Sequence, residues 1–346
     1  MRRGRHDTFG APADHPAGAR KLAGGSPASL VANASSAEVV AMKDGGASAP
    51  NEETACSEYT PTPLFAFDAQ GARVTVWPAQ SSGNARNRTG EGGQENGSNS
   101  DDANRNTQDN HIGDSCGNDG IDCDNRIGDN SNRLNHIVYL HVYDGDGLDV
   151  LSECQRISCP PFALVAIKPA CWNDDLTPWE CPGLFADDAP FAGHAQDQLR
   201  LLEEGIIPQV ERESSEPNGA RICRTVAGYS LAGLFATWTA FNSSTFSRIA
   251  SASGSLWYPD FARFVTEAPL ARPIDCAYFS LGSKEAKTPS RLLRNVATGT
   301  DEVVAAFRSK GVPTQFESNP GNHFKEPALR MARGITWAIS QQAPNR

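Results

Sequence analysis

The stretch from Val226 to Phe235 constrains the fold of this chain more than any other part of the sequence. It runs from a β-branched strand end through Gly-Tyr-Ser-Leu-Ala-Gly into an apolar segment with helical spacing. We interpret it as the Gly-x-Ser-x-Gly turn between a strand and a helix, although Ala232 stands at the fifth position and Gly233 follows it. The pattern predicts a nucleophile elbow with Ser230 at its apex.

The chemistry of a nucleophilic serine explains why this turn is needed. A serine hydroxyl reacts only when it is held clear of the backbone, near a base and beside donors that stabilise an oxyanion. Gly228 and Gly233 leave room where a Cβ would collide with the neighbouring strand or helix. The backbone N–H of Leu231 begins the helix, so we expect it to point into an oxyanion hole.

The flanks of this turn separate an elbow from an ordinary Gly/Ser turn at a strand-to-helix junction. Residues 221–227 are strand-like, and the apolar residues after the turn recur at helical spacing: Leu231, Leu234, Phe235, Trp238 and Phe241. This context favours the elbow over the ordinary turn.

Composition narrows the partners of the protein. The 346 residues carry a net charge of −10, with a pI near 5.2, whereas nucleic-acid and anionic-membrane surfaces need a basic face. No run approaches the roughly 20 apolar residues of a membrane span. We therefore expect neither a nucleic acid nor a membrane as partner.

The apolar residues are unevenly distributed along the chain. Residues 1–55 are rich in Ala, Gly, Ser and Pro, which predicts a disordered or weakly ordered extension before a folded domain over 56–346. Residues 80–132 are dominated by Asn, Asp, Gly and Ser and predict a disordered insertion in one loop. A metal site in this insertion is not expected, because Arg126 and Ile127 break the calcium-loop pattern and too few zinc ligands are present.

The start of the chain and its cysteines bear on localisation. Residues 1–5 are basic, but no apolar segment follows them as a signal peptide requires. The nine cysteines are an odd number, and without an export signal they favour reduced thiols in a cytoplasmic protein. Pairing of Cys154 with Cys159, and of Cys171 with Cys181, under oxidation is the alternative.

Strand and helix patterns alternate through the folded part. Residues 64–77 predict an antiparallel hairpin at the sheet edge, whereas residues 137–143 and 162–167 are continuous apolar runs typical of buried parallel strands. Further strands are expected at 246–253, 276–282 and 314–318. Helices are expected near 194–212, kinked at Pro208, and at 301–310, with a final helix that turns Leu329, Ala332, Ile335 and Trp337 inward. This order predicts a mostly parallel central sheet with helices on both faces.

Two loops after later strands supply partners for Ser230. The carboxyl ends of parallel strands share one edge of the sheet, and Glu285 and His323 follow the strands at 276–282 and 314–318. The order Ser, acid, His is that of α/β-hydrolases. We predict His323 as general base and Glu285 as the acid that orients it, with Asp275 and Asp301 as weaker candidates and a solvated loop as the alternative for Glu285.

The remaining site predictions concern the oxyanion hole and the substrate. The second oxyanion donor is expected just after the first central strand, at the backbone of Tyr143 or Asp144. Trp172, Trp179 and Trp257 either cap the core or line a substrate cleft.

Four stretches together resemble a known family. They are the elbow, residues 246–257, Ser280 to Glu285, and Pro320 to Phe324. From about residue 137 to 340 the chain resembles the esterases of the α/β-hydrolase superfamily that include esterase-D-like proteins and siderophore esterases. The resemblance implies an α/β-hydrolase fold and a serine carboxylesterase acting on a small-molecule ester, with Ser230 as nucleophile and His323 as base. Residues 1–55 and 80–132 have no counterpart in that family.

Three functional hypotheses follow. The leading one is hydrolysis of a carboxylic ester through an acyl-serine intermediate, without a metal or organic cofactor. The second is transfer of the acyl group to another hydroxyl, as mycolyltransferases of this fold do with the same triad. The third is a non-catalytic binding protein, which intact Ser230, Glu285 and His323 disfavour. The sequence makes no prediction of the oligomeric state.

Overall fold

The computed structural model describes residues 61–79, 134–185, 187–213 and 221–342. All of them belong to one compact unit. The predicted extension over 1–55 and the predicted insertion over 80–132 lie outside the described residues, so both stay predictions.

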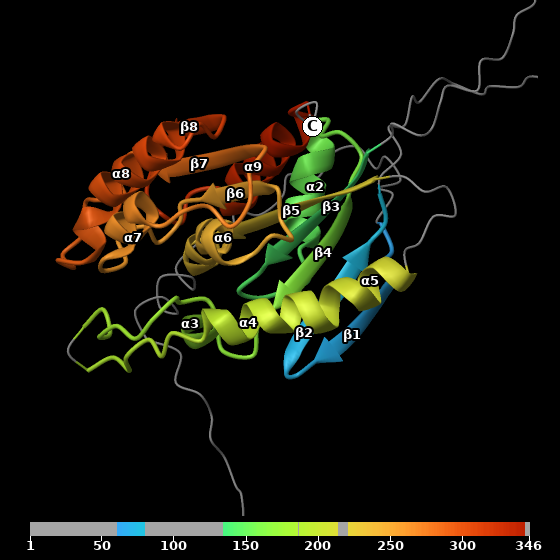
Figure 1. Cartoon of the computed structure of the whole chain (residues 1–346), viewed down its shortest axis with the longest axis horizontal. Helices are drawn as coiled ribbons and strands as arrows, with labels where there is room; N and C mark the ends of the chain where they lie inside the picture. The colour runs from blue at the N-terminus through green and yellow to red at the C-terminus, as the bar shows by residue number, and fades with distance from the viewer. Residues whose placement is uncertain (1–60, 80–133, 186, 214–220, 343–346) are drawn as a thin grey trace, which may run out of the picture. The chain divides into compact units, whose positions relative to one another are not determined.

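One eight-stranded sheet organises the described residues (Figure 1). Its strands lie in the order β1-β2-β4-β3-β5-β6-β7-β8, and β2 pairs antiparallel with β1 and β4 while the other pairs are parallel. The strands are β1 (Phe65–Ala69), β2 (Ala72–Trp77), β3 (Leu134–His141), β4 (Ala163–Lys168), β5 (Arg221–Tyr229), β6 (Arg248–Ala252), β7 (Cys276–Gly282) and β8 (Thr314–Asn319). The mostly parallel sheet and its edge hairpin are confirmed.

The hairpin closes through a two-residue turn. Gln70 and Gly71 both have positive φ, at 48° and 88°, which suits the right-handed twist of the two strands that they join. Ala69 pairs with Ala72 directly across the turn.

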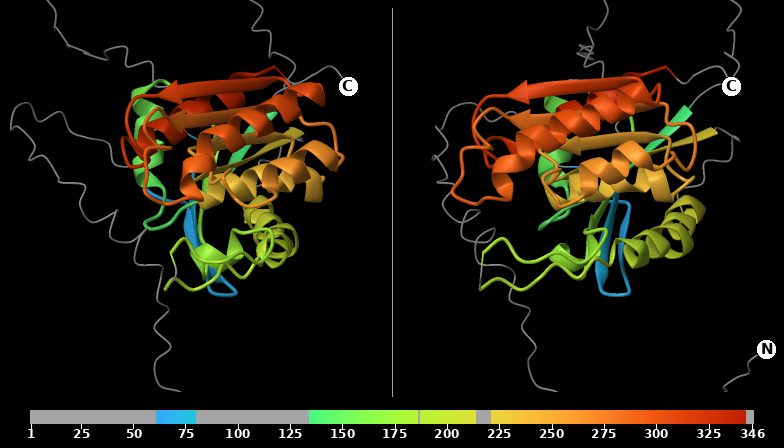
Figure 2. Two further views of the ribbon diagram at one scale, coloured as in Figure 1. Left: turned by 90° about the vertical axis from the view of Figure 1, so that its left-hand side faces the viewer. Right: turned by 60° about the vertical axis from the view of Figure 1, so that its left-hand side comes forward.

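Helices cover both faces of the sheet, as the sequence predicts (Figure 2). One hydrophobic cluster packs α2 (Leu148–Arg156) and α9 (Pro327–Ser340) against the sheet. A second, larger cluster holds α6 (Leu231–Asn242), α7 (Phe261–Glu267), α8 (Val296–Ser309) and the long helix after residue 194 on the opposite face. Two short helical segments, α3 (Trp172–Asp175) and η3 (Leu293–Asn295), lie between these elements.

The long helix shows what Pro208 does. It runs through α4 (Ala195–Leu201), a π-helical turn η2 (Leu202–Ile206) and α5 (Ile207–Glu213). A proline inside a helix has no N–H to donate, and its ring clashes with the carbonyl four residues earlier, here that of Glu204. The wider π turn lies at that point, so the predicted disturbance takes the form of a π turn within one helix. The predicted stripe is buried: Leu199, Leu202, Ile206, Ile207 and Val210.

Several element ends differ from the prediction. β3 ends at His141, two residues before the predicted end, and β6 is confined to Arg248–Ala252. α8 begins at Val296, before the predicted start at Asp301; in its added first turn, Gly299 lies so close to the Leu256 carbonyl that a Cβ there would be 2.2 Å from the oxygen. In α9, Ala332 and Ile335 are buried as predicted, whereas Leu329 and Trp337 are half-buried.

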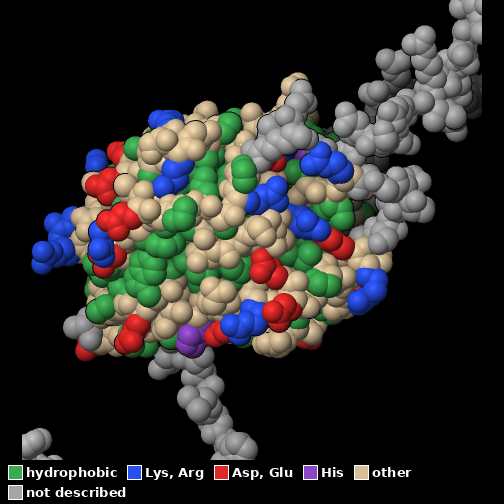
Figure 3. All heavy atoms as spheres, viewed as in Figure 1, with side chains coloured by type: hydrophobic (Ala, Val, Ile, Leu, Met, Phe, Trp, Pro, Cys, Tyr) green, Lys and Arg blue, Asp and Glu red, His purple; other side chains and the backbone are tan. Residues whose placement is uncertain are grey.

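Three general properties concern cysteines, membranes and surface charge. The cysteines at 154, 159, 171, 181, 223 and 276 are free thiols. No helix in the described part of the chain is both long and apolar enough to cross a membrane. On the face shown in Figure 3, acidic and basic side chains of the described residues are intermixed.

Candidate active site

Ser230 lies at the junction of β5 and α6, the position that the elbow requires. Its backbone has φ 58° and ψ −124°, outside the regions that a non-glycine residue normally occupies. Such strain costs about 1–3 kcal/mol and persists only where the surrounding structure enforces it. The strained turn presents Ser230 to a pocket while its backbone stays hydrogen-bonded to Ala252 and Ser255.

The glycines of the elbow are needed for close backbone approach. A Cβ on Gly228 would lie 2.3 Å from the carbonyl carbon of Ala232. A Cβ on Gly233 would lie 2.8 Å from Ser251 Oγ and 2.9 Å from the Gly254 Cα. Gly233 therefore makes the close contact with the neighbouring strand and its loop, and Ala232 is accommodated at the fifth position of the motif.

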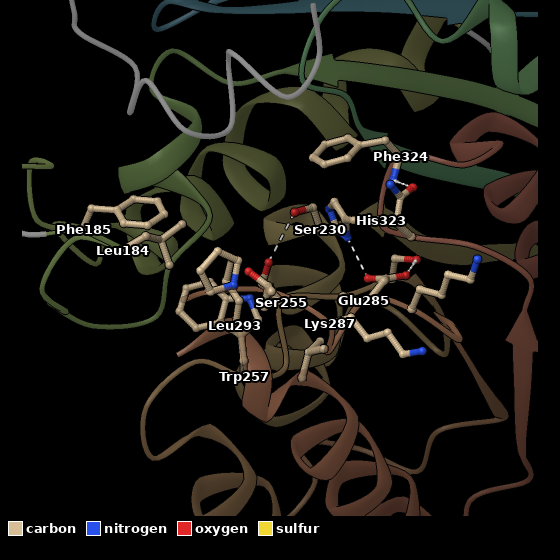
Figure 4. Close-up of a pocket in the computed structure, with 17 residues that line it drawn as sticks. Leu184, Phe185, Ser230, Ser255, Trp257, Glu285, Lys287, Leu293, His323 and Phe324 are labelled. Carbon is tan, nitrogen blue, oxygen red and sulfur yellow. Dashed lines mark hydrogen bonds and ion pairs between the residues drawn. The ribbon is translucent and has the colours of Figure 1, made fainter. Parts of the chain in front are cut away.

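His323 and Glu285 meet beside the elbow. The imidazole Nδ1 of His323 lies 2.8 Å from Glu285 Oε2, and both residues line the same pocket as Ser230. Figure 4 shows the His323 ring between Ser230 and Glu285. The structure thus brings together the three residues that the sequence predicts as nucleophile, base and acid.

Glu285 is held by a dense set of donors. Its side chain is 2% exposed, and Oε1 accepts hydrogen bonds from Ser253 Oγ at 2.8 Å, the Gly282 N–H at 2.5 Å and Arg330 Nη1 at 3.1 Å. Burial acts to raise the pKa of this carboxyl, but hydrogen bonds and charge from His323, with those from Ser253 and Gly282, lower its pKa below the ordinary value. Glu285 is therefore a buried, ionised carboxylate and not the solvated loop residue of the alternative interpretation.

The other candidate acids lie elsewhere. Asp275 precedes β7, where its N–H donates to the Ser247 carbonyl, and Asp301 is exposed within α8. Neither residue lines the pocket that holds Ser230 and His323.

The pocket has a volume of about 310 Å³ and walls that are mostly apolar. Beside Ser230, Glu285 and His323, it is lined by Leu184, Phe185, Trp257, Leu293, Val296 and Phe324 (Figure 4). Phe185 and Phe324 are 46% and 40% exposed, which is unusual for large apolar side chains. These two rings form an accessible apolar rim.

Of the three predicted tryptophans, Trp257 lines this pocket and the other two do not. Trp179 packs on Tyr258 and Phe264, and its indole N–H donates to the Pro259 carbonyl at 3.1 Å. Trp172 makes an edge contact with Tyr143, with ring centroids 5.3 Å apart. Trp179 therefore packs against the segment 257–264 and caps the core, as one of the two interpretations of its sequence position predicts.

The two predicted oxyanion residues occupy the expected elements. Leu231 is the first residue of α6, whose first N–H groups have no partner within the helix. Tyr143 follows β3 in the loop that leads to α2. Their donation to an oxyanion stays a prediction.

Sequence reasoning missed two polar contacts of this site. Ser255 Oγ lies 3.3 Å from Ser230 Oγ, and Arg330 reaches Glu285 from α9. A signal for Arg330 was present, because it is a charged residue beside Met331 and Ala332 on the apolar stripe of α9. Ser255 carried no such signal, since it lies in a serine-rich run, Ser251 to Ser255.

Comparisons with known proteins give one relative and many similar folds. No family model matches the chain. The uncharacterized protein YbbA of Bacillus subtilis (strain 168) is 28% identical over 213 residues, which cover 57% of this chain and 84% of that protein.

Among solved structures, the siderophore hydrolase EstB from Aspergillus nidulans is similar with a TM-score of 0.53 and 16% identity, over 84% of this chain and all (100%) of EstB. The siderophore hydrolase EstA from the same organism gives a TM-score of 0.47 and 20% identity, over 62% of this chain and 85% of EstA. With its eight-stranded sheet, its elbow and its similarity to EstB, the chain has the α/β-hydrolase fold that its resemblance to siderophore-esterase-like proteins predicts.

Proposed function

We propose that the protein is a serine carboxylesterase that cleaves a small-molecule ester through an acyl-serine intermediate. The observation that carries the proposal is the arrangement around His323. One nitrogen of this ring contacts the buried carboxylate of Glu285 at 2.8 Å, and the ring lies between that carboxylate and Ser230 on its strained turn. Nucleophile, base and orienting acid in this relation are the requirements of acyl transfer.

The first half of the proposed reaction is acylation. Ser230 Oγ attacks the ester carbonyl while His323 takes its proton, and Glu285 stabilises the resulting imidazolium. The Leu231 N–H and a backbone N–H at Tyr143 or Asp144 stabilise the oxyanion. The tetrahedral intermediate then expels the alcohol, which receives the proton from His323.

The second half is deacylation. His323 removes a proton from water, the resulting hydroxide attacks the acyl-serine carbonyl, and Ser230 Oγ leaves with the proton held by His323. These steps use only side chains, backbone donors and water.

The apolar walls around Trp257 and the rim at Phe185 and Phe324 suit an ester with apolar acyl or alcohol groups. Siderophore esters join the substrate screen because EstB, which shares the fold, is described as a siderophore hydrolase.

The test is turnover of p-nitrophenyl acetate and butyrate by the wild type and by Ser230→Ala, with fluorophosphonate labelling of both. We expect labelling to vanish in the variant and kcat to fall by about 10⁶-fold, leaving the residual catalysis that substrate binding and the oxyanion hole supply. Ser152→Ala is the matched control, because this serine is exposed on α2 and donates only to the Leu148 carbonyl. It should label and turn over as the wild type does.

Two other results would contradict the proposal. A wild type that labels at Ser230 without hydrolysing esters indicates that another hydroxyl, and not water, accepts the acyl group. A wild type that neither labels nor turns over indicates a binding protein on a hydrolase fold.

A further inference from the structure

Arg330 is a buried arginine directly behind the site. It lies in the first turn of α9, its side chain is 2% exposed, and it does not line the pocket. Its Nη1 contacts Glu285 Oε1 at 3.1 Å, Ser253 Oγ at 3.1 Å and Tyr229 Oη at 3.2 Å. Each of these groups belongs to the carboxyl end of a central strand or to the loop after it.

The other half of the guanidinium holds the loop that carries His323. Nη2 donates to the carbonyls of Pro320 and Asn322, at 3.0 Å each. Tyr229, which accepts a hydrogen bond from Nη1, donates from its hydroxyl to the His323 carbonyl at 2.5 Å. One planar group therefore connects the acid on one loop to the backbone of the base on another.

We propose that Arg330 is a positioning residue for the Ser230–His323–Glu285 set, acting through the carboxylate and through the backbone of residues 320–323. The proposal rests on the function inferred above for these three residues. By occupying Oε1, Arg330 and its neighbours leave Oε2 as the oxygen that faces His323 Nδ1. By holding the two carbonyls, Arg330 fixes the position of the ring relative to Ser230.

Stability alone does not account for a buried ion pair at this place. Burial of two charges costs several kcal/mol per ion, and apolar residues of similar volume often replace such pairs without loss of stability. Arg330 makes five hydrogen bonds, all to the acid, to groups beside it or to the loop that carries the base. This concentration of contacts on the site favours a role in positioning.

The test compares Arg330→Met, Arg330→Lys and the matched control Arg248→Met. Arg248 is also fully buried and also contacts α9, where its Nη1 donates to the Ala338 carbonyl at 2.6 Å, far along the helix from Glu285. Both methionine variants should lose thermal stability. A change in the kinetic constants that occurs only in Arg330→Met therefore reports on the site. The readouts are kcat, KM and the pH dependence of kcat/KM.

For Arg330→Met we expect kcat to fall by about 10²-fold with KM changed less than about threefold, because small displacements of catalytic groups act mainly on the chemical step. In the acidic limb, kcat/KM should fall more steeply with decreasing pH than in the wild type, since loss of a cation beside Glu285 raises the pKa of that carboxyl, and protonated Glu285 does not support His323 as base. Arg330→Lys should restore the limb but not all of kcat, because one ammonium cannot hold both the carboxylate and the two carbonyls.

A second readout needs no turnover. Carboxyl ¹³C resonances, with Glu285 assigned through Glu285→Gln, should show a titration midpoint about one unit higher in Arg330→Met than in the wild type and in Arg248→Met. A wild type without esterase activity would overturn the proposed function while this measurement still tests Arg330. Unchanged titration of Glu285 in Arg330→Met, or an equal change in Arg248→Met, would overturn the positioning role.

Discussion

Burial of the His141 imidazole should make the free energy of unfolding depend on pH. His141 is the last residue of β3, is 1% exposed and packs edge-on against Phe235, with ring centroids 4.8 Å apart. The amide of Gln198 donates to its Nε2 at 3.0 Å, which requires that nitrogen to be unprotonated. Its buried Nδ1 has no hydrogen-bond partner among the described residues. Burial lowers the pKa of His141 from 6.5 to about 3.

The direction of this pH effect follows from the protonation of His141 in the folded and in the unfolded chain. Above pH 6.5 His141 is neutral both folded and unfolded, so its titration costs no stability. Below that pH the unfolded chain binds a proton that the folded chain refuses, and stability is lost until the pH reaches the folded pKa. Each pH unit is worth about 1.4 kcal/mol, so the loss at pH 5 is about 2 kcal/mol.

The assay is urea unfolding of the wild type and of His141→Gln at pH 7 and pH 5. The glutamine does not titrate and offers a carbonyl to Gln198, so the wild type should lose about 2 kcal/mol more than the variant between the two pH values. Burial also lowers the pKa of His136, to about 4, but His136 is present in both proteins, so its contribution to the free energy of unfolding cancels in the comparison. His194→Gln, at an exposed position, is the control and should behave as the wild type. Equal losses in the wild type and His141→Gln would refute this reasoning.

Two further predictions concern the elbow and the aromatic cluster. Gly228→Ala places a Cβ 2.3 Å from the Ala232 carbonyl carbon, so urea unfolding should show an overpacking loss of about 1–3 kcal/mol and kcat should fall strongly. The control is Gly205→Ala, whose new Cβ would lie 3.4 Å from its nearest atom, and an active, stable Gly228→Ala would contradict the close approach. Trp179→Phe removes the hydrogen bond to Pro259, so the free energy of unfolding should fall by about 1 kcal/mol with KM unchanged, whereas a raised KM would show that Trp179 contacts substrate.

The resemblance of the sequence to siderophore-esterase-like proteins was enough to predict the fold. The spacing of apolar residues was enough to predict most of the strands and helices. Continuous apolar runs marked β3 and β4, because strands covered on both faces bury nearly every side chain. Element ends were less predictable. The first turn of α8 lies against the Leu256 carbonyl at Gly299, a contact between segments that no local pattern records.

The sequence by itself also determined which residues meet at the site. Ser230, Glu285 and His323 each follow a parallel strand, and the carboxyl ends of such strands lie at one edge of the sheet, so their order along the chain implies their proximity in space. The shape of the elbow follows in the same way from its two glycines.

Only the tertiary structure decided what surrounds these residues. Arg330 contacts Glu285, 45 positions earlier in the chain, because α9 packs across β5, β6 and β7 and brings one particular turn behind the carboxylate. Trp179 faces Phe264 and not the pocket for a similar reason, since the segment 257–264 docks against it. Contacts of this kind depend on the relative placement of packed elements, which is set by side-chain volume and hydrogen bonding across the whole core and not by the period of any one segment.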